Sequence, residues 1–159
     1  MKKIYLTLII ALFFLMGENR LQAQTTLTKL NQIELIKQFI GNWKGEIGKD
    51  TTAFWEIKSN GTGIECKFKF VMKDNIILEG NQLWAYDNKV EKFIYDAGNS
   101  ALWFTSKNIS VLVQSNEMAD PDRAISKLEM EFKSPDVFLQ RSIVNNHIFK
   151  TDTYKRIKN

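Results

Sequence analysis

Residues 65–73, with the sequence ECKFKFVMK, decide the fold class of this chain because their polarity alternates residue by residue. Successive side chains of a β-strand point to opposite faces, so Cys66, Phe68 and Phe70 share one face and the charged residues share the other. Residues 124–133, AISKLEMEFK, repeat the pattern. Both segments therefore predict antiparallel strands with one buried face and one hydrated face.

Turn-forming pairs such as Asn60-Gly61, Asp87-Asn88, Pro135-Asp136 and Asn145-Asn146 divide the rest of the chain into similar short segments. Consecutive antiparallel strands with one apolar face hide that face in a closed barrel or a two-sheet sandwich. We predict an all-β fold, an up-and-down antiparallel β-barrel of eight to ten strands. The expected strands are 42–48, 51–59, 62–73, 75–86, 89–97, 100–107, 109–117, 123–133, 136–144 and 147–157.

A short helix is expected before the first strand. Leu30, Ile33, Ile36 and Ile40 recur at spacings of three and four, which is the period of one helix face. Thr28 is the expected cap at its start, and residue 41, a glycine, marks its end.

Residues 1–23 have the pattern of an export signal. Lys2 and Lys3 precede an apolar run over 4–16 that is short for a membrane span, and Ala23 offers a small residue for cleavage. A retained anchor is the alternative, because Leu21 is bulkier than the residue usual at that position. We expect a bacterial protein that is exported to the periplasm or the medium, with residues 24–159 as one domain and no stable transmembrane segment after cleavage.

Composition excludes several classes of function. Loss of the signal removes three cations and only one acid, so the basic balance gives little support for a nucleic-acid partner. The single cysteine, Cys66, rules out an internal disulfide, and the single histidine, His147, argues against a histidine-based metal centre. Nothing in the sequence pairs a nucleophile with a base. We expect no enzyme activity and no cofactor, with haem on His147 as a minor alternative.

A short motif connects the helix to the first strand. Gly41-Asn42-Trp43 begins that strand, Trp84-Ala85-Tyr86-Asp87 ends a later one, and Arg156 lies on the last. This arrangement resembles the calycin superfamily, and in particular lipocalin-like secreted bacterial domains. The resemblance implies a barrel whose closed end is covered by Trp43, with Arg156 packed over the indole. The classical lipocalin T-D-Y segment and disulfide are absent.

The turns predict which side chains face the interior. A three-residue loop at 73–75 pairs Phe70 with Leu78 and Phe68 with Gly80, and it places Met72 opposite Ile76. The Asp87-Asn88 turn places Gln82 opposite Phe93 and Gly80 opposite Tyr95. The inward-facing side chains either line a ligand pocket or fill a small barrel completely. The wall predicted in this way contains Phe68, Phe70, Trp84, Phe93, Tyr95, Leu102 and Phe104.

The opposite wall is predicted from two further turns. A two-residue loop at Pro135-Asp136 pairs Phe132 with Leu139 and Met130 with Arg141. The Asn145-Asn146 turn then sets Arg141 opposite Lys150 and Leu139 opposite Asp152. Arg141 thereby faces the interior together with Tyr154, unless a one-residue slip turns it to solvent.

The leading functional hypothesis is a non-catalytic barrel that binds a small hydrophobic or amphipathic molecule, including one with an anionic head group. Aromatic side chains would bury its apolar part, and Arg141 and Tyr154 would hold the anion. The alternative is an envelope or extracellular protein-interaction domain with a solid core and an exposed cluster around Phe54, Trp55 or Trp103. The predicted ligand-binding residues are Phe68, Phe70, Trp84, Phe93, Tyr95, Arg141 and Tyr154.

Overall fold

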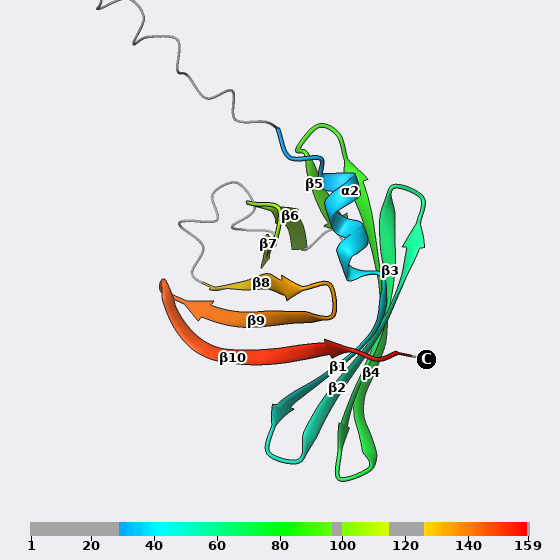
Figure 1. Ribbon diagram of the computed structural model, residues 1–159, viewed down its shortest axis with the longest axis vertical. Helices are drawn as coiled ribbons and strands as arrows, with labels where there is room; N and C mark the ends of the chain where they lie inside the picture. Colours follow the sequence, from blue (N-terminus) through cyan, green and yellow to red (C-terminus); the bar gives the residue numbers. More distant parts are fainter. Residues whose placement is uncertain (1–28, 97–99, 115–125, 159) are drawn as a thin grey trace, which may run out of the picture.

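The computed structural model describes residues 29–96, 100–114 and 126–158, and the expected signal at 1–23 lies outside them. Ten antiparallel strands of the described chain form a closed barrel in which each strand pairs with its neighbours in sequence and β1 pairs with β10 (Figure 1). The strands are β1 (Gly41–Gly48), β2 (Thr51–Asn60), β3 (Gly63–Met72), β4 (Asn75–Asp87), β5 (Lys92–Tyr95), β6 (Ser100–Phe104), β7 (Ile109–Gln114), β8 (Ser126–Ser134), β9 (Val137–Val144) and β10 (His147–Arg156).

The predicted fold class is confirmed: the protein is an all-β, up-and-down barrel preceded by a short helix. The strand limits follow the alternating pattern and the turn pairs closely. β5 and β6 are shorter than expected, because β5 begins only at Lys92 and β6 ends at Phe104.

The helix before the barrel is shorter than the periodic pattern suggested. Helix α2 spans Gln32–Ile36 and continues as a 3₁₀ turn, η2, over Lys37–Phe39. Its cap is Asn31, whose Oδ1 accepts a hydrogen bond from the Glu34 backbone N–H at 3.2 Å, whereas the expected cap, Thr28, lies outside the described residues. The Gln32 side-chain amide exchanges two hydrogen bonds with the backbone of Phe104, at 3.0 and 2.7 Å, and so fixes the helix to β6.

Trp43 and Arg156 meet at the end of the barrel that the helix covers. The guanidinium carbon of Arg156 lies 4.2 Å from the centre of the Trp43 ring, and the two residues are paired across β1 and β10. Arg156 Nη2 also donates to the backbone oxygens of Pro135, at 2.9 Å, and Gln38, at 3.1 Å. The expected contact between the indole and the terminal arginine is therefore confirmed, and we call this region the closed end.

Gly41 makes the closed end compatible with the position of Arg156. Its φ is 134°, and a β-carbon there would lie 2.1 Å from Arg156 Nη1. A larger residue would therefore be strained and would also displace the guanidinium.

The predicted registers of the two hairpins that contain β4 need correction. β3 and β4 are joined by a two-residue turn, Lys73-Asp74, with φ of 48° and 67°, so Met72 pairs with Asn75 and not with Ile76. A bulge between Phe70 and Val71 then restores the predicted pairs of Phe68 with Gly80 and Phe70 with Leu78.

The hairpin between β4 and β5 has a longer turn than predicted. Trp84 pairs with Tyr95, and Tyr86 pairs with Phe93. The expected pairs, Gln82 with Phe93 and Gly80 with Tyr95, are therefore wrong. The Asp87 carboxylate accepts a hydrogen bond from the Lys89 N–H at 2.7 Å, and Glu91 has a φ of 56°, which together extend the turn to residue 91. The observed register differs from the predicted one by an even number of residues. Because side chains alternate between the two faces, Trp84, Phe93 and Tyr95 remain on the predicted face.

Candidate ligand cavity

The barrel is not filled by its own side chains. Between the aromatic residues of the closed end and the opposite rim lies a cavity of about 420 Å³, within the range of about 300–1,000 Å³ typical of small-molecule sites. Leu78, half exposed, lies both on the cavity wall and at the rim. The lining residues are Phe39, Trp55, Ile57, Ile64, Cys66, Phe68, Phe70, Leu78, Gln82, Trp84, Tyr95, Ser100, Leu102, Leu112, Leu128, Met130 and Gln140.

Four of the seven predicted ligand-binding residues line this cavity: Phe68, Phe70, Trp84 and Tyr95. Two pairs of them are in ring contact, Phe68 with Phe70 at 5.7 Å and Trp84 with Tyr95 at 5.5 Å. They come from β3, β4 and β5, as the alternation of polarity required. Leu102, from the same predicted wall, also lines the cavity.

Phe93 and Tyr154 are buried in the core but do not line the cavity. Phe93 packs against Tyr86 at 5.2 Å, and Phe104, also on the predicted wall, packs against Phe39 at 6.1 Å. Tyr154 stacks on Phe138 at 4.8 Å with an angle of 6° between the rings. These residues belong to the packed part of the interior.

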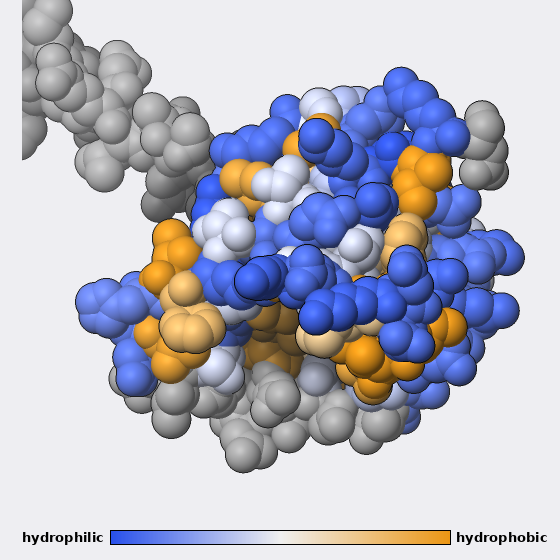
Figure 2. Space-filling model, turned by 90° about the horizontal axis from the view of Figure 1, so that it is seen from below, coloured by the Kyte–Doolittle hydropathy of each residue, from blue (hydrophilic) through white to orange (hydrophobic). Residues whose placement is uncertain are grey.

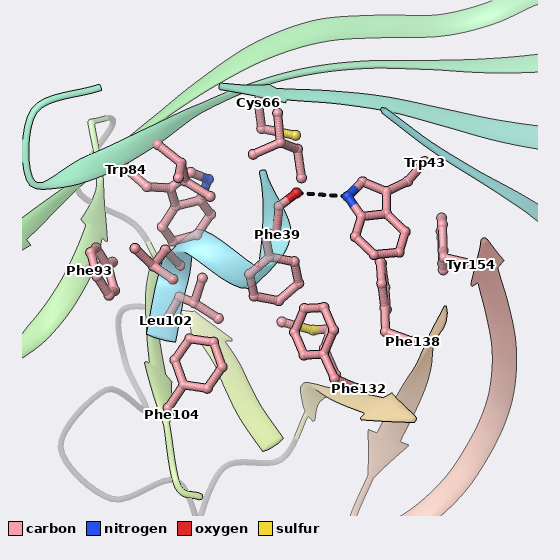
Figure 3. Packing of buried hydrophobic residues seen from close by; sticks show 14 of the residues in the cluster. Phe39, Trp43, Cys66, Trp84, Phe93, Leu102, Phe104, Phe132, Phe138 and Tyr154 are labelled. Atoms are coloured by element: carbon pink, nitrogen blue, oxygen red, sulfur yellow. Dashed lines mark hydrogen bonds between the residues drawn. The ribbon is translucent and has the colours of Figure 1, made fainter. Parts of the chain in front are cut away.

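The packed part of the interior forms the closed end itself and bounds the cavity on that side. Phe39, Trp43, Phe132, Phe138 and Tyr154 lie side by side there, and the Trp43 indole N–H donates to the Phe39 carbonyl at 2.7 Å (Figure 3). Burial raises the pKa of the Tyr154 hydroxyl, and the nearby Asp152 adds to that shift. Tyr154 is therefore a neutral phenol at physiological pH.

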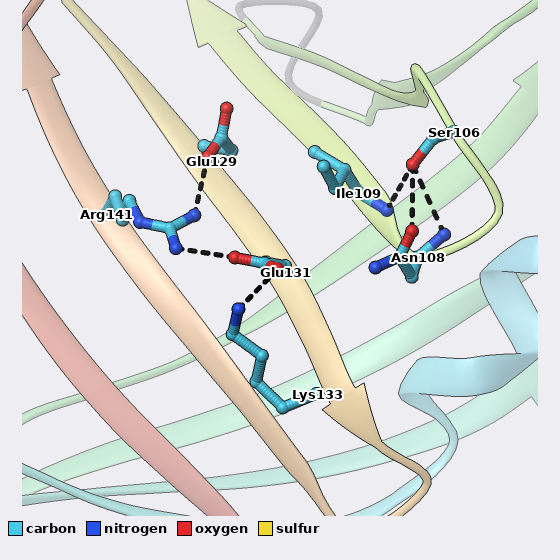
Figure 4. A network of polar contacts seen from close by, with 7 residues as sticks. All are labelled: Ser106, Asn108, Ile109, Glu129, Glu131, Lys133 and Arg141. Atoms are coloured by element: carbon cyan, nitrogen blue, oxygen red, sulfur yellow. Dashed lines mark hydrogen bonds and ion pairs between the residues drawn. The ribbon is translucent and has the colours of Figure 1, made fainter.

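The predicted inward position of Arg141 is wrong. Met130 pairs with Gln140, and Arg141 pairs with Glu129 across β8 and with Thr151 across β10, so Arg141 lies on the outer face of β9. It forms ion pairs there with Glu129, at 2.7 Å, and with Glu131 (Figure 4). Arg141 therefore does not line the cavity, and its guanidinium is paired with two carboxylates on the outer face.

Two bulges cause the change of face. Both turns contain two residues, as predicted, but the register shifts between Phe132 and Ser134 in β8 and between Ile148 and Lys150 in β10. Each shift reverses the face of the paired strand, so β9 turns Phe138 and Gln140 inward while the predicted faces of β8 and β10 are kept. The expected pairs of Leu139 with Phe132 and with Asp152 are therefore also wrong.

The tryptophan and phenylalanine positions assigned to an outer cluster do not lie together. Trp55 faces inward and lines the cavity, whereas Phe54 faces outward, with Lys69 Nζ 5.2 Å from its ring centre. Trp103 packs outside the barrel against Val111 and Val113, with Lys92 Nζ 4.2 Å above its ring.

Two polar atoms beside the cavity have no hydrogen-bond partner in the described structure. They are the indole Nε1 of Trp55 and the amide Oε1 of Gln140, and both atoms are buried. Neither residue was among the predicted site residues. Trp55 was expected only in an exposed cluster, but it lies on the inner face of β2, whereas Gln140 faces inward because of the bulges on either side of β9.

The cavity wall is electrically neutral: among its described lining residues, none is an acid or a base that is charged at neutral pH. Burial raises the pKa of the Cys66 thiol to about 12, so it stays protonated there. Outside the lining set, in the middle of β10, Asp152 is buried and pairs with Lys150 at 2.9 Å; Lys150 also donates to the Ile47 carbonyl.

The remaining functional expectations concern metals and membranes. His147 is exposed at the start of β10. In the described part of the chain, no group of three or more His, Cys, Asp or Glu side chains is arranged to hold a metal ion. Residues 29–96, 100–114 and 126–158 contain no helix with the length and apolar character needed to cross a membrane.

Apolar side chains are exposed at two hairpin tips on the rim away from the closed end. Seen from the side of the β1–β2 and β3–β4 turns, apolar patches stand out on a mainly hydrophilic surface (Figure 2). The tip of β3 and β4 exposes Met72, Ile76, Ile77 and Leu78, and the tip of β9 and β10 exposes Val144, Ile148 and Phe149.

The sequence was also compared with known proteins. No protein-family model matches it, and no curated protein matches it. The fold therefore rests on the structure itself, which is a closed, ten-stranded antiparallel β-barrel compatible with a lipocalin-like architecture.

Proposed function

We propose that this protein is an exported, non-catalytic binding protein of the lipocalin-like type, which holds a small apolar or amphipathic molecule inside its barrel. The observation that carries the proposal is the cavity of about 420 Å³, lined mainly by aromatic and aliphatic side chains. Each methylene group that moves from water into such a site contributes about 0.8 kcal/mol. A short hydrocarbon chain would therefore supply useful affinity without any charged contact.

Two further observations support the proposal. The cavity has polar side chains at only a few positions, Gln82, Tyr95, Ser100 and Gln140 among them, which is the composition typical of ligand pockets. The contact of Trp43 with Arg156 is the one that the family resemblance implied. A cavity of this size favours ligand binding over the alternative of an interaction domain with a solid core.

The direct test is mass spectrometry of organic extracts from the purified protein, together with titration of apolar probes against its tryptophan fluorescence. Trp55 and Trp84 lie on the cavity wall, so an occupant should change their emission. Leu128→Trp would fill the cavity and should abolish probe binding. The matched control is Leu139→Trp, because Leu139 lies on the outer face of β9. An empty extract and no probe binding would refute the proposal.

Export is a separate part of the proposal. It is supported by the sequence of residues 1–23. Fractionation of cells that express the full chain, followed by N-terminal sequencing, should find the protein outside the cytoplasm and beginning near Gln24. A cytoplasmic protein that retains Met1 would contradict export without affecting the proposal of ligand binding.

A further inference from the structure

We infer that the cavity selects an uncharged molecule with a hydroxyl or primary amide head group and rejects a carboxylate. This inference rests on the proposed function and names its ligand class. It differs from the expectation based on sequence, which assigned an anionic head group to Arg141.

The first argument is the absence of compensating charge. None of the described lining residues carries a positive charge, and Arg141 is held outside the barrel by Glu129 and Glu131. Moving an ionised carboxylate from water into an apolar cavity costs far more than moving a hydroxyl, unless a cation pairs with it. A fatty acid would therefore have to be protonated to enter.

The second argument is the pair of buried polar atoms without partners. Trp55 Nε1 is a donor only, and Gln140 Oε1 is an acceptor. Both residues adjoin Phe138: the Trp55 ring centre lies 6.0 Å from that of Phe138, and Gln140 is the next inward residue along β9. A hydroxyl group accepts one hydrogen bond and donates another, so it offers the two capacities that these buried atoms lack, provided that the side chains of Trp55 and Gln140 turn toward it. A primary amide has the same two capacities.

The third argument is the charge near the expected head-group position. Gln140 is paired in register with Asp152, whose side chain is only 7% exposed. The Lys150 ammonium, which neutralises Asp152, also donates to the Ile47 carbonyl. A second carboxylate beside Gln140 would meet Asp152, while the Lys150 ammonium is already bonded to Asp152 and to the Ile47 carbonyl. The electrostatic environment therefore disfavours anions specifically.

The test compares three probes of equal chain length: decan-1-ol, decanoate and decane, titrated against tryptophan fluorescence at about pH 7.5. We expect decan-1-ol to bind at least about tenfold more tightly than decanoate, which is a difference of about 1.4 kcal/mol. Decanoate binding equal to or tighter than that of decan-1-ol would overturn the inference and leave the proposed function standing. Failure of all three probes to bind would instead contradict the proposed function.

Variants assign the selectivity to residues. Gln140→Met removes the acceptor at similar side-chain length, and it should weaken decan-1-ol about fivefold to tenfold while leaving decane unchanged. Leu139→Met, on the outer face of the same strand, should change neither. Asp152→Asn frees Lys150 from its partner and should strengthen decanoate binding severalfold. An equal loss of decan-1-ol and decane in Gln140→Met, or unchanged decanoate binding in Asp152→Asn, would show that these groups do not set the selectivity.

Discussion

Trp43 and Trp55 are directly paired across β1 and β2, yet their surroundings differ. The Trp43 indole is fully buried; its N–H donates to Phe39, and its ring is covered by the Arg156 guanidinium. The Trp55 indole lines the cavity, and its N–H has no partner in the described structure. The two paired tryptophans therefore lie in different environments. The indole N–H of Trp43 has a hydrogen-bond acceptor, and that of Trp55 has none in the described structure.

The difference separates the part of the barrel that stabilises the fold from the part available for binding. At the closed end, rings contact rings, and the donors of Arg156 meet backbone carbonyls. On the cavity side, apolar walls and unpaired polar atoms remain. Substitutions at the closed end should therefore reduce stability, whereas substitutions around the cavity should mainly change ligand affinity.

The largest effect is expected for Phe138→Ala at the centre of the closed end. Phe138 is fully buried and contacts Trp43 at 4.9 Å and Tyr154 at 4.8 Å, so its loss leaves a large hole among rings that are held in place by other contacts. The free energy of unfolding should fall by about 3–5 kcal/mol in urea denaturation. The control is Phe149→Ala at the rim, where the side chain is 80% exposed and the change should stay within about 0.5 kcal/mol. Equal effects would invalidate the distinction between the two regions.

Arg156→Met should have the next largest effect. The substitution keeps much of the aliphatic length but removes the donors to Gln38, Ile40 and Pro135 and the cation above Trp43. We expect a loss of about 2–3 kcal/mol in the free energy of unfolding, with part of it recovered in Arg156→Lys. Lys155→Met, the exposed neighbour, serves as control. A stability equal to that of the parent protein would mean that the closed end does not depend on Arg156.

Alkaline pH should lower the free energy of unfolding through Cys66, which lies on the cavity wall. Burial raises its thiol pKa to about 12 in the fold, against an ordinary value of 9.0, so the folded state holds the proton more tightly than the unfolded state does. The stabilisation is therefore complete below about pH 9 and is lost as pH rises from there toward 12. Between about pH 8 and 10.5 the loss from Cys66 should be about 2 kcal/mol, measured as the difference in urea denaturation between the parent protein and Cys66→Ala. An identical pH dependence in both proteins would exclude this cause.

The smallest effect is expected for Arg141→Met. Its ion pairs with Glu129 and Glu131 lie on the outer surface, where such pairs contribute below about 1 kcal/mol. Affinity for decan-1-ol should stay within about twofold of the parent value, since Arg141 does not line the cavity. A large, head-group-dependent loss of affinity would restore the inward position predicted from the sequence.

Much of the fold could be predicted from the sequence because alternation and turn chemistry are local properties. The strands, the inward faces of β3, β4, β8 and β10, and the contact of Trp43 with Arg156 follow from patterns of this kind. The face of β9 does not, because its sequence, VFLQRSIV, is apolar on both sides. Bulges at Lys133 and Phe149 decide between the two faces, and they depend on the packing of neighbouring strands.

One signal could have corrected the position of Arg141. Glu129 and Glu131 alternate with Met130 on β8, so they had to lie on its outer face and favour a cation across the sheet. Arg141 supplies that cation, and hydrogen bonds from Lys133 and Arg141 lower the pKa of the Glu131 carboxyl. The cavity itself could not be predicted, because it depends on the volumes of side chains from many strands, and Gln140 reaches it only through the bulges.

The space inside the barrel depends on the absence of a side chain at position 80. Gly80 lies opposite Phe68, and a β-carbon there would be 2.7 Å from the tip of the Phe68 ring. The ring therefore lies against the wall of the barrel only because Gly80 has no side chain. Any other residue would push the ring toward the cavity and shorten the longest molecule that fits. If the barrel binds a ligand as proposed, the residue at position 80 would therefore limit the length of that ligand without contacting its polar group.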